Sequence, residues 1–240
     1  MRSHLPRGHA RHIAVTALCA VPLILLSLIS TARAADAQPD LSTPEKALAA
    51  FIKALDDGDA AKLDTVATGD AKQREWIHAL GAQLAGFRAL EAALAKKYGP
   101  AYAGTDAGKE ITDQIDDARD EDLRTDLKKA KLGPAKGDAA ALILDEATPD
   151  DHQGRLVRTA GGWKVDLDSL AQYASGGDVP VLQAMAKAAG ELARDVGSGK
   201  FASIDEAAKA TEERLNAAAE PAPKKPDAGT APAKAPAKQR

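Results

Sequence analysis

Apolar residues recur at helical spacing near the start of the chain. Within residues 44–57 they lie three or four positions apart on one side, which is the pattern of an amphipathic helix, and the glycine that follows can end it. Ser42 can begin this helix, with Glu45 completing a capping box. The alternative start is Thr43, which puts Pro44 at the first helical position. The apolar stripe consists of Leu48, Phe51, Ile52 and Leu55.

A long amphipathic helix is predicted over residues 70–98, where a Gly-Pro pair ends it. Two glycines inside it, Gly81 and Gly86, indicate close approach to neighbouring elements. Its apolar positions are Ile77, Leu80, Leu84, Phe87, Leu90, Leu94 and Tyr98.

Two shorter helices are predicted on either side of this long one. Asp59 can cap the first, which turns Leu63 and Val66 inward. The second runs through Ile111 and Ile115.

Alternation with a period of two begins after residue 130 and predicts strands. Residues 131–132 can form a short first strand, and residues 138–145 a second one. The second strand would bury one face, which carries Ala140, Leu142 and Leu144.

A hairpin is predicted from residues 154–159 and 163–168, joined through Ala160-Gly161-Gly162, where the glycines supply positive φ. The second arm alternates, so one of its faces is buried and the other wet. The buried set is Trp163, Val165 and Leu167, and the wet set is Lys164, Asp166 and Asp168.

Residues 176–216 return to helical spacing, with a break at residues 197–199 and a capping box formed by Ser203 and Glu206. We interpret these helices as an extension that packs on the outside of the domain or closes it. The alternative is that they bind a partner. The apolar face of the first of them consists of Val181, Leu182, Met185, Ala189, Leu192 and Val196.

Two separated segments resemble NTF2-like domains. The first is the threonine-proline-glutamate start of the first helix together with its LDDGD ending, and the second is the Gly-Trp-Lys-Val sequence of the hairpin. The resemblance implies an α+β cone in which N-terminal helices pack on a small curved antiparallel sheet. It also implies that a cavity can lie between the first helix and the sheet, and that the domain can form a homodimer through the sheet. It implies no activity.

The first 34 residues have the order of a secretory signal peptide: arginines, an apolar run over residues 13–29 and a small-residue site ending at Ala34. We expect cleavage after Ala34 and export to the periplasm or the exterior. The alternative is a retained anchor, because the run approaches the ~17 residues that a membrane span needs. Cleavage removes Cys19, the only cysteine, so the mature chain can form no disulfide.

Five segments are therefore expected along the chain. They are a signal peptide (1–34), a linker (35–41), the α+β domain (42–175), a helical extension (176–219) and a disordered Ala/Pro/Lys-rich basic tail (220–240).

Charge separates the folded part from the tail. The whole chain carries −3: the four arginines of the first 34 residues contribute +4, residues 35–219 contribute −10 and the tail contributes +3. The basic tail either tethers the protein to an anionic envelope polymer or partner, or only keeps the chain soluble. Nucleic acid is not expected as a partner, because the folded part is acidic, aromatic residues are scarce and the protein is exported.

Acidic residues crowd residues 113–126, which suggests a calcium loop. The spacing does not fit one: counted from Asp120, the fifth position is Arg124 and the sixth is Thr125, where a glycine is required. Interleaved basic residues favour a solvated, charge-laced face instead. We expect no metal, and no nucleotide or other cofactor, because the glycine-rich phosphate motifs are also missing.

Catalysis has few candidates. Asp166, Asp168 and His152 can act as acid–base residues only if they face the interior of the cone. The alternation instead places both aspartates opposite Trp163, where they should face solvent. The expected function is an exported, non-enzymatic module that binds an unknown small molecule or protein. The alternative is an isomerase or cyclase type of enzyme that uses these carboxylates. The residues expected to line the core or a pocket are Phe51, Leu55, Trp76, Leu80, Leu142, Leu144, Trp163, Val165 and Leu167.

Overall fold

The first helix, α1 (Pro44–Asp57), begins after Thr43, whose backbone is extended and whose hydroxyl accepts a hydrogen bond from Lys46 N. The sequence allows two starts for this helix, and the structure has the one at Thr43, which puts Pro44 at the first helical position. Gly58 ends the helix in the left-handed conformation, with φ of 63°.

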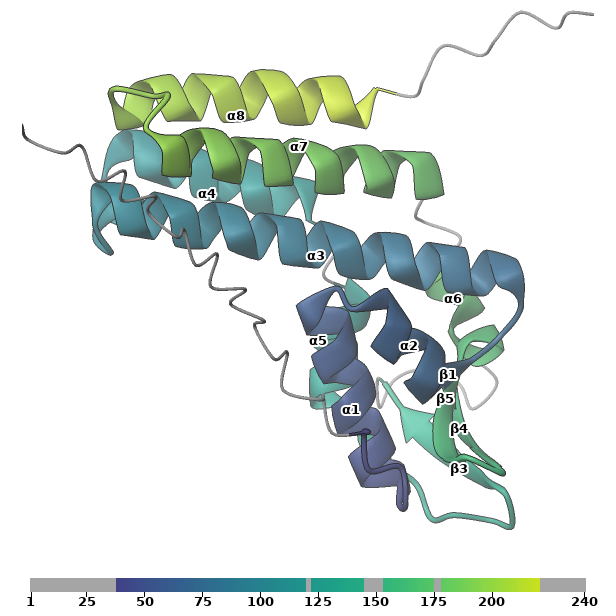
Figure 1. The fold of residues 1–240 in the computed structure, drawn as a ribbon. Helices are drawn as coiled ribbons and strands as arrows, with labels where there is room; N and C mark the ends of the chain where they lie inside the picture. The colour runs from purple at the N-terminus through teal and green to yellow at the C-terminus, as the bar shows by residue number, and fades with distance from the viewer. Residues whose placement is uncertain (1–37, 120–121, 145–152, 175–177, 221–240) are drawn as a thin grey trace, which may run out of the picture. The chain divides into compact units, whose positions relative to one another are not determined.

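The protein is described in a computed structural model, which covers residues 38–119, 122–144, 153–174 and 178–220. These residues belong to one compact unit that begins at Gln38. The unit is α+β, mainly helical, with an open five-stranded sheet (Figure 1). The expected signal peptide and nearly all of the expected tail lie outside the described residues.

The sheet has the order β1-β5-β4-β3-β2. Neighbouring strands are antiparallel except at one edge, where β1 runs parallel to β5. The sheet is therefore mixed, and the expectation of an antiparallel sheet is wrong at that edge. The strands are β1 (Ala67–Thr68), β2 (Lys131–Leu132), β3 (Ala139–Ile143), β4 (Gly154–Thr159) and β5 (Gly162–Asp166).

Strand β1 directly follows the short helix α2 (Ala60–Val66), which Asp59 caps as expected. Ala67 pairs with Val165 and Thr68 with Asp166. Two residues are too few to show alternation, so no sequence pattern identifies this strand.

The predicted hairpin forms between β4 and β5, but only one of its glycines has positive φ. Gly162, at 104°, starts β5 opposite Thr159. The next amide, Trp163 N, donates to Leu41 O over 2.8 Å, so the chain ahead of α1 lies on this strand. After Asp166 the chain leaves the sheet for the short helices η3 (Leu167–Leu170) and α6 (Ala171–Ala174), so Leu167 is not a strand residue.

The long helix α3 (Ala71–Tyr98) has 28 residues and serves two hydrophobic cores. Asp70 and Gln73 form a capping box at its start. Its first half packs with α1, α2 and the sheet, through Trp76, Ile77, Leu80 and Leu84. Its second half packs with three other helices, through Phe87, Leu90 and Leu94.

Those three partners are α4 (Asp106–Ala118), α7 (Val179–Ser198) and α8 (Ile204–Ala219). Figure 1 shows α3, α7 and α8 side by side, with α4 behind them, and α7 packs along α3. The C-terminal helices α7 and α8 therefore form a second core with α3 and α4, whereas we expected an extension that packs on the outside of the domain or closes it. Ser203 caps α8 as predicted, while the Glu206 carboxylate accepts from Ala202 N, one residue earlier than in a standard capping box.

The two glycines of α3 lie where neighbouring elements approach it closely, as the sequence predicted. A Cβ added at Gly86 would lie 3.0 Å from Ala186 O on α7. Gly81 faces the turn after α1: a Cβ added at Gly58 would lie 2.8 Å from Gly81 O. The turn can reach the α3 backbone only because both residues lack side chains.

Asp56 connects three helices through its carboxylate and backbone. Arg88 of α3 donates to both its carboxylate and its carbonyl oxygen, and Arg124 Nε lies 2.6 Å from Oδ1. Lys128 Nζ is 3.6 Å from Oδ2. Arg124 and Lys128 lie on α5 (Asp122–Lys129), a short polar helix that the sequence did not predict. Asp56 therefore holds α5 against α1 and α3.

Burial acts to raise the pKa of Asp56, but the hydrogen bonds and positive charges of Arg124 and Arg88 outweigh it and lower this pKa. A carboxylate with a lowered pKa stabilises the fold above its unfolded pKa, near ~4, and that contribution is lost as pH falls through the folded value.

We predict that Asp56→Asn lowers the free energy of unfolding by about 1–3 kcal/mol at pH 7 because charge-assisted hydrogen bonds are lost. The difference from the unmodified protein should shrink below about pH 4. Urea unfolding at both pH values measures it. Asp57→Asn is the control: Asp57 forms an exposed pair with Lys53, so a change of at most about 0.5 kcal/mol is expected. Equal effects of the two variants would contradict the role of Asp56.

We predict that Gly58→Ala costs about 3 kcal/mol or more, because it combines left-handed strain with a clash against the α3 backbone. Gly199→Ala is the matched control. Gly199 also ends a helix with positive φ, but a Cβ there meets only the tip of Lys97, at 3.9 Å. Strain alone should cost about 1–2 kcal/mol at this position. Equal losses in thermal unfolding would show that the contact with α3 contributes nothing.

Candidate functional site

The side of the sheet that faces the helices is filled. Leu142, Leu156 and Val165 point to this side and are fully buried, in the same cluster as Phe51. Trp163 belongs to this cluster too, and α1 packs on β5. All the residues expected to line a core or pocket lie in it: Phe51, Leu55, Trp76, Leu80, Leu142, Leu144, Trp163, Val165 and Leu167. They are core residues, in contact with one another.

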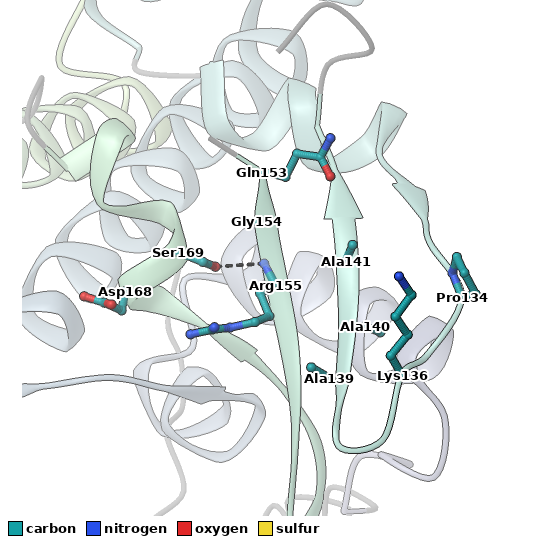
Figure 2. Close-up of a pocket in the computed structure, with 10 residues that line it drawn as sticks. All are labelled: Pro134, Lys136, Ala139, Ala140, Ala141, Gln153, Gly154, Arg155, Asp168 and Ser169. Atoms are coloured by element: carbon teal, nitrogen blue, oxygen red, sulfur yellow. Dashed lines mark hydrogen bonds between the residues drawn. The ribbon is translucent and has the colours of Figure 1, made fainter. Parts of the chain in front are cut away.

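A groove of about 600 Å³ lies on the opposite, open face of the sheet. Figure 2 shows it crossing β4 and β3 and reaching the segment that precedes β3. None of the expected core or pocket residues lines it. Its lining consists of Pro134, Lys136, Ala139, Ala140, Ala141, Gln153, Gly154, Arg155, Asp168 and Ser169.

The groove follows from alternation along β3. Ala140 and Leu142 point into the core, so Ala139 and Ala141 point to the open face. Alanine side chains are too short to fill the space between their longer neighbours, Lys136 on one side and Arg155 on the other (Figure 2). The alternation is visible in the sequence of this strand, but the sequence indicated only which face is buried, not that the other face is hollow.

Arg155 and Asp166 form an ion pair on this face. Arg155 Nε donates to Asp166 Oδ2 over 3.0 Å and Nη2 donates to the same oxygen over 2.5 Å. The Asp166 side chain is only 11% exposed, whereas the Arg155 side chain is 52% exposed. The carboxylate thus lies beneath the guanidinium group and fixes its position.

Ser169 forms hydrogen bonds with the backbone of both Arg155 and Asp166. Its hydroxyl accepts from Arg155 N over 2.8 Å and donates to the carbonyl oxygen of Asp166 over 2.6 Å. The Asp166 carboxylate also caps η3 by accepting from Asp168 N. β4, β5 and η3 are thereby tied together at one wall of the groove.

The expectation that Asp166 faces solvent is wrong. Asp166 does point to the face opposite Trp163, as the alternation predicts. However, this residue is only 8% exposed, because η3 and Arg155 cover it. Asp168 is exposed, as expected, and accepts a hydrogen bond from Gln73 Nε2 over 3.1 Å. Figure 2 shows its carboxylate directed away from the alanines. His152 lies outside the described residues.

Lys136 forms the opposite wall. Its backbone exchanges two hydrogen bonds with Ala139 across a turn in which Gly137 has φ of 64°. Within the described part of the chain, its ammonium group has neither an ion pair nor a hydrogen bond. The turn lies between the two strands that the sequence predicted over residues 131–132 and 138–145, but the sequence gave no reason to single out this lysine.

The groove combines an apolar floor with hydrogen-bond donors at its walls. In the described ranges, no group of three or more His, Cys, Asp or Glu side chains is placed to hold a metal ion. Asp166 already accepts hydrogen bonds from Arg155, and Asp168 accepts one from Gln73 with its carboxylate directed away from the alanines (Figure 2). Lys136 and Arg155 present donors to a ligand.

Comparisons with protein-family models, curated proteins and solved structures found no match for this chain. In the described residues, every helix is too short or too polar to cross a membrane.

Proposed function

We propose that the protein is a non-enzymatic binding module that takes its ligand in the groove on the open face of the sheet. The observation that carries this proposal is the contrast between the two faces. One face is packed against helices, while the other has a hollow within the ~300–1,000 Å³ range of small-molecule sites. Its walls carry polar groups and its floor is apolar.

Residues 42–175 would then be an NTF2-like domain whose interior is filled by side chains. This assignment is supported by the position of α1 over β5 and by the presence of Phe51 and Trp163 in one core. A filled interior moves ligand binding to the other face of the sheet. The alternative of an isomerase or cyclase is not favoured, because Asp166 is committed to Arg155.

We predict that Ala141→Leu blocks the groove and leaves the fold intact, because Ala141 is exposed and points away from the core. Nitrogen–proton correlation spectra of the ¹⁵N-labelled protein, recorded with neutral, anionic and cationic fragments, measure binding. Fragments should shift the amides of residues 139–141 and 153–155. Their affinity should fall about tenfold or more in the variant, because the added side chain occupies the site.

Ala217→Leu, on the exposed side of α8, is the control for a larger side chain elsewhere on the surface. It should bind the same fragments with unchanged affinity. Fragments that shift amides around Phe51 and leave the groove amides unmoved would contradict the proposal. The same conclusion would follow if no fragment in the library perturbed the groove.

We also propose that the protein is exported and cleaved after Ala34. When the full chain is produced in a secretion-competent bacterial host, mass spectrometry of the exported product should show Ala35 as its first residue. Recovery of the intact chain in the membrane fraction would instead support the anchor alternative.

A further inference from the structure

We propose that the open face of the sheet binds an extended acidic peptide segment of a partner protein. The segment crosses the strands, with one acidic side chain beside Lys136 and a second beside Lys164. An apolar side chain between the two acids lies in the hollow above Ala139 and Ala141. This inference rests on the proposed function, since it names the ligand of the same groove.

The two lysines end a row of paired residues that runs across the strands. Lys136 pairs with Ala139 across the turn that precedes β3. Ala139 pairs with Val157 of β4, and Val157 pairs with Lys164 of β5. Directly paired residues point to the same face of a sheet, and Ala139 points to the open one. The open face therefore carries a row with a lysine at each end and two apolar residues between them.

The spacing of the two lysines matches that of side chains along an extended peptide. Neighbouring strands lie about 4.8 Å apart, so three steps separate the backbones of Lys136 and Lys164 by roughly 14 Å. In an extended peptide, residues i and i+4 point to the same side and are also roughly 14 Å apart, with residue i+2 midway between them. Acids at i and i+4 can therefore reach the two lysines while an apolar residue at i+2 reaches the hollow.

Both lysines are available for a ligand. Within the described residues, the ammonium groups of Lys136 and Lys164 form no ion pair and no hydrogen bond. Asp138 lies two residues after Lys136 in the turn, but it forms no ion pair with this lysine. Lys53 and Lys200, by contrast, are paired with aspartates. An acid that binds at the ends of the row thus gains an attraction without breaking an existing ion pair.

The other charges near the groove do not cancel this attraction. Arg155 and Asp166 balance each other in their ion pair, so the peptide needs no contact with the arginine. Asp168 is bonded to Gln73, and its carboxylate is directed away from the alanines (Figure 2). Residues 35–219 are acidic as a whole, but at physiological salt charges beyond about 8 Å are largely screened. The nearby lysines therefore decide which ligand charge is attracted.

The charge of this face also favours a peptide over a second copy of the protein. A two-fold dimer through the open face would place the same lysine-bearing surface against itself. The short side chains of Ala139 and Ala141 instead leave room for a larger apolar side chain of a ligand. The homodimer that the NTF2-like resemblance implies is therefore not the occupant that the charges favour.

Three peptides test the charge pattern. Acetyl-Glu-Ala-Leu-Ala-Glu-amide has acids at i and i+4, and acetyl-Gln-Ala-Leu-Ala-Gln-amide lacks both charges. Acetyl-Glu-Ala-Glu-Ala-Leu-amide keeps the composition of the first peptide but brings the acids closer together. Titrations of the ¹⁵N-labelled protein should give a dissociation constant on the order of millimolar for the first peptide. The second should bind about fivefold to tenfold more weakly and the third about threefold more weakly, with shifts at the amides of residues 136, 139–141, 157 and 164.

Lys136→Gln and Lys164→Gln should each reduce the affinity for the first peptide about threefold, because each removes one attraction. Neither should change the affinity for the glutamine peptide, and this unchanged binding also shows that the variants are folded. Lys187→Gln is the matched control. Lys187 is exposed on α7, which is not part of the sheet, so its replacement should leave both affinities unchanged.

The outcomes separate this inference from the function on which it rests. If the glutamine peptide or the reordered peptide binds as tightly as the first one, the inference is overturned and the groove remains a binding site. The same holds if fragments shift the groove amides but no peptide does. If neither fragments nor peptides shift them, both proposals fail. An equal loss in Lys187→Gln would assign the effect to general surface charge and would also overturn the inference.

Two further measurements test the other occupants of this face. Sebacate is a small diacid with an apolar chain, and it should bind more weakly than the first peptide. Tighter binding of sebacate would replace the peptide with a small molecule and overturn the inference. Sedimentation of the protein should show a monomer. A dimer whose formation shifts the amides of residues 139–141 would identify a second copy as the occupant and would overturn the inference as well.

Discussion

The structure depends on the burial of one helix, α3, whose buried residues run from Trp76 to Leu94. Leu80 in the first half of α3 and Leu90 in the second half are both fully buried, but they lie in different cores. Burying a leucine stabilises the fold by roughly 1.5–3 kcal/mol. Because α3 contributes buried residues to both cores, unfolding of this helix would destabilise both of them. The contacts are close because α3 has glycines where the turn after α1 and helix α7 meet it. Without this helix, the apolar faces of the sheet and of the C-terminal helices would both be exposed to water.

Among the described residues, this arrangement also leaves one face of the sheet uncovered. Helices α1 and α2 pack on β5 from the α3 side, and the remaining long helices pack among themselves around the second half of α3. A sheet normally buries at least one face and can leave the other in contact with water. In this protein the wet face carries alanines between longer side chains, so its exposed surface is hollowed. The groove is a consequence of how the cores are distributed.

Local signals predicted most of the fold. Caps such as Asp59 and Ser203, the glycine after α1 and the alternation of Trp163 with Val165 are each encoded within a few residues, and the structure has them all. Features that depend on distant residues were missed. Strand β1 exists because β5 offers it an edge, and α5 is held by Asp56, which lies 68 residues before Arg124. The site was missed for the same reason. Asp166 is buried by Arg155 and by the η3 turn, and alternation along the strand predicts neither contact.

The position of the ion pair supports the proposal that the open face binds a ligand without catalysing a reaction. A catalytic carboxylate needs a free lone pair directed at the reacting atoms. Asp166 uses one oxygen for Arg155 and the other for an amide of η3, so it serves the wall of the groove. The same bonds make Arg155 a fixed donor with part of its guanidinium group still exposed. A side chain whose rotamer is already fixed loses little entropy when it contacts a ligand, which favours binding at this wall of the groove.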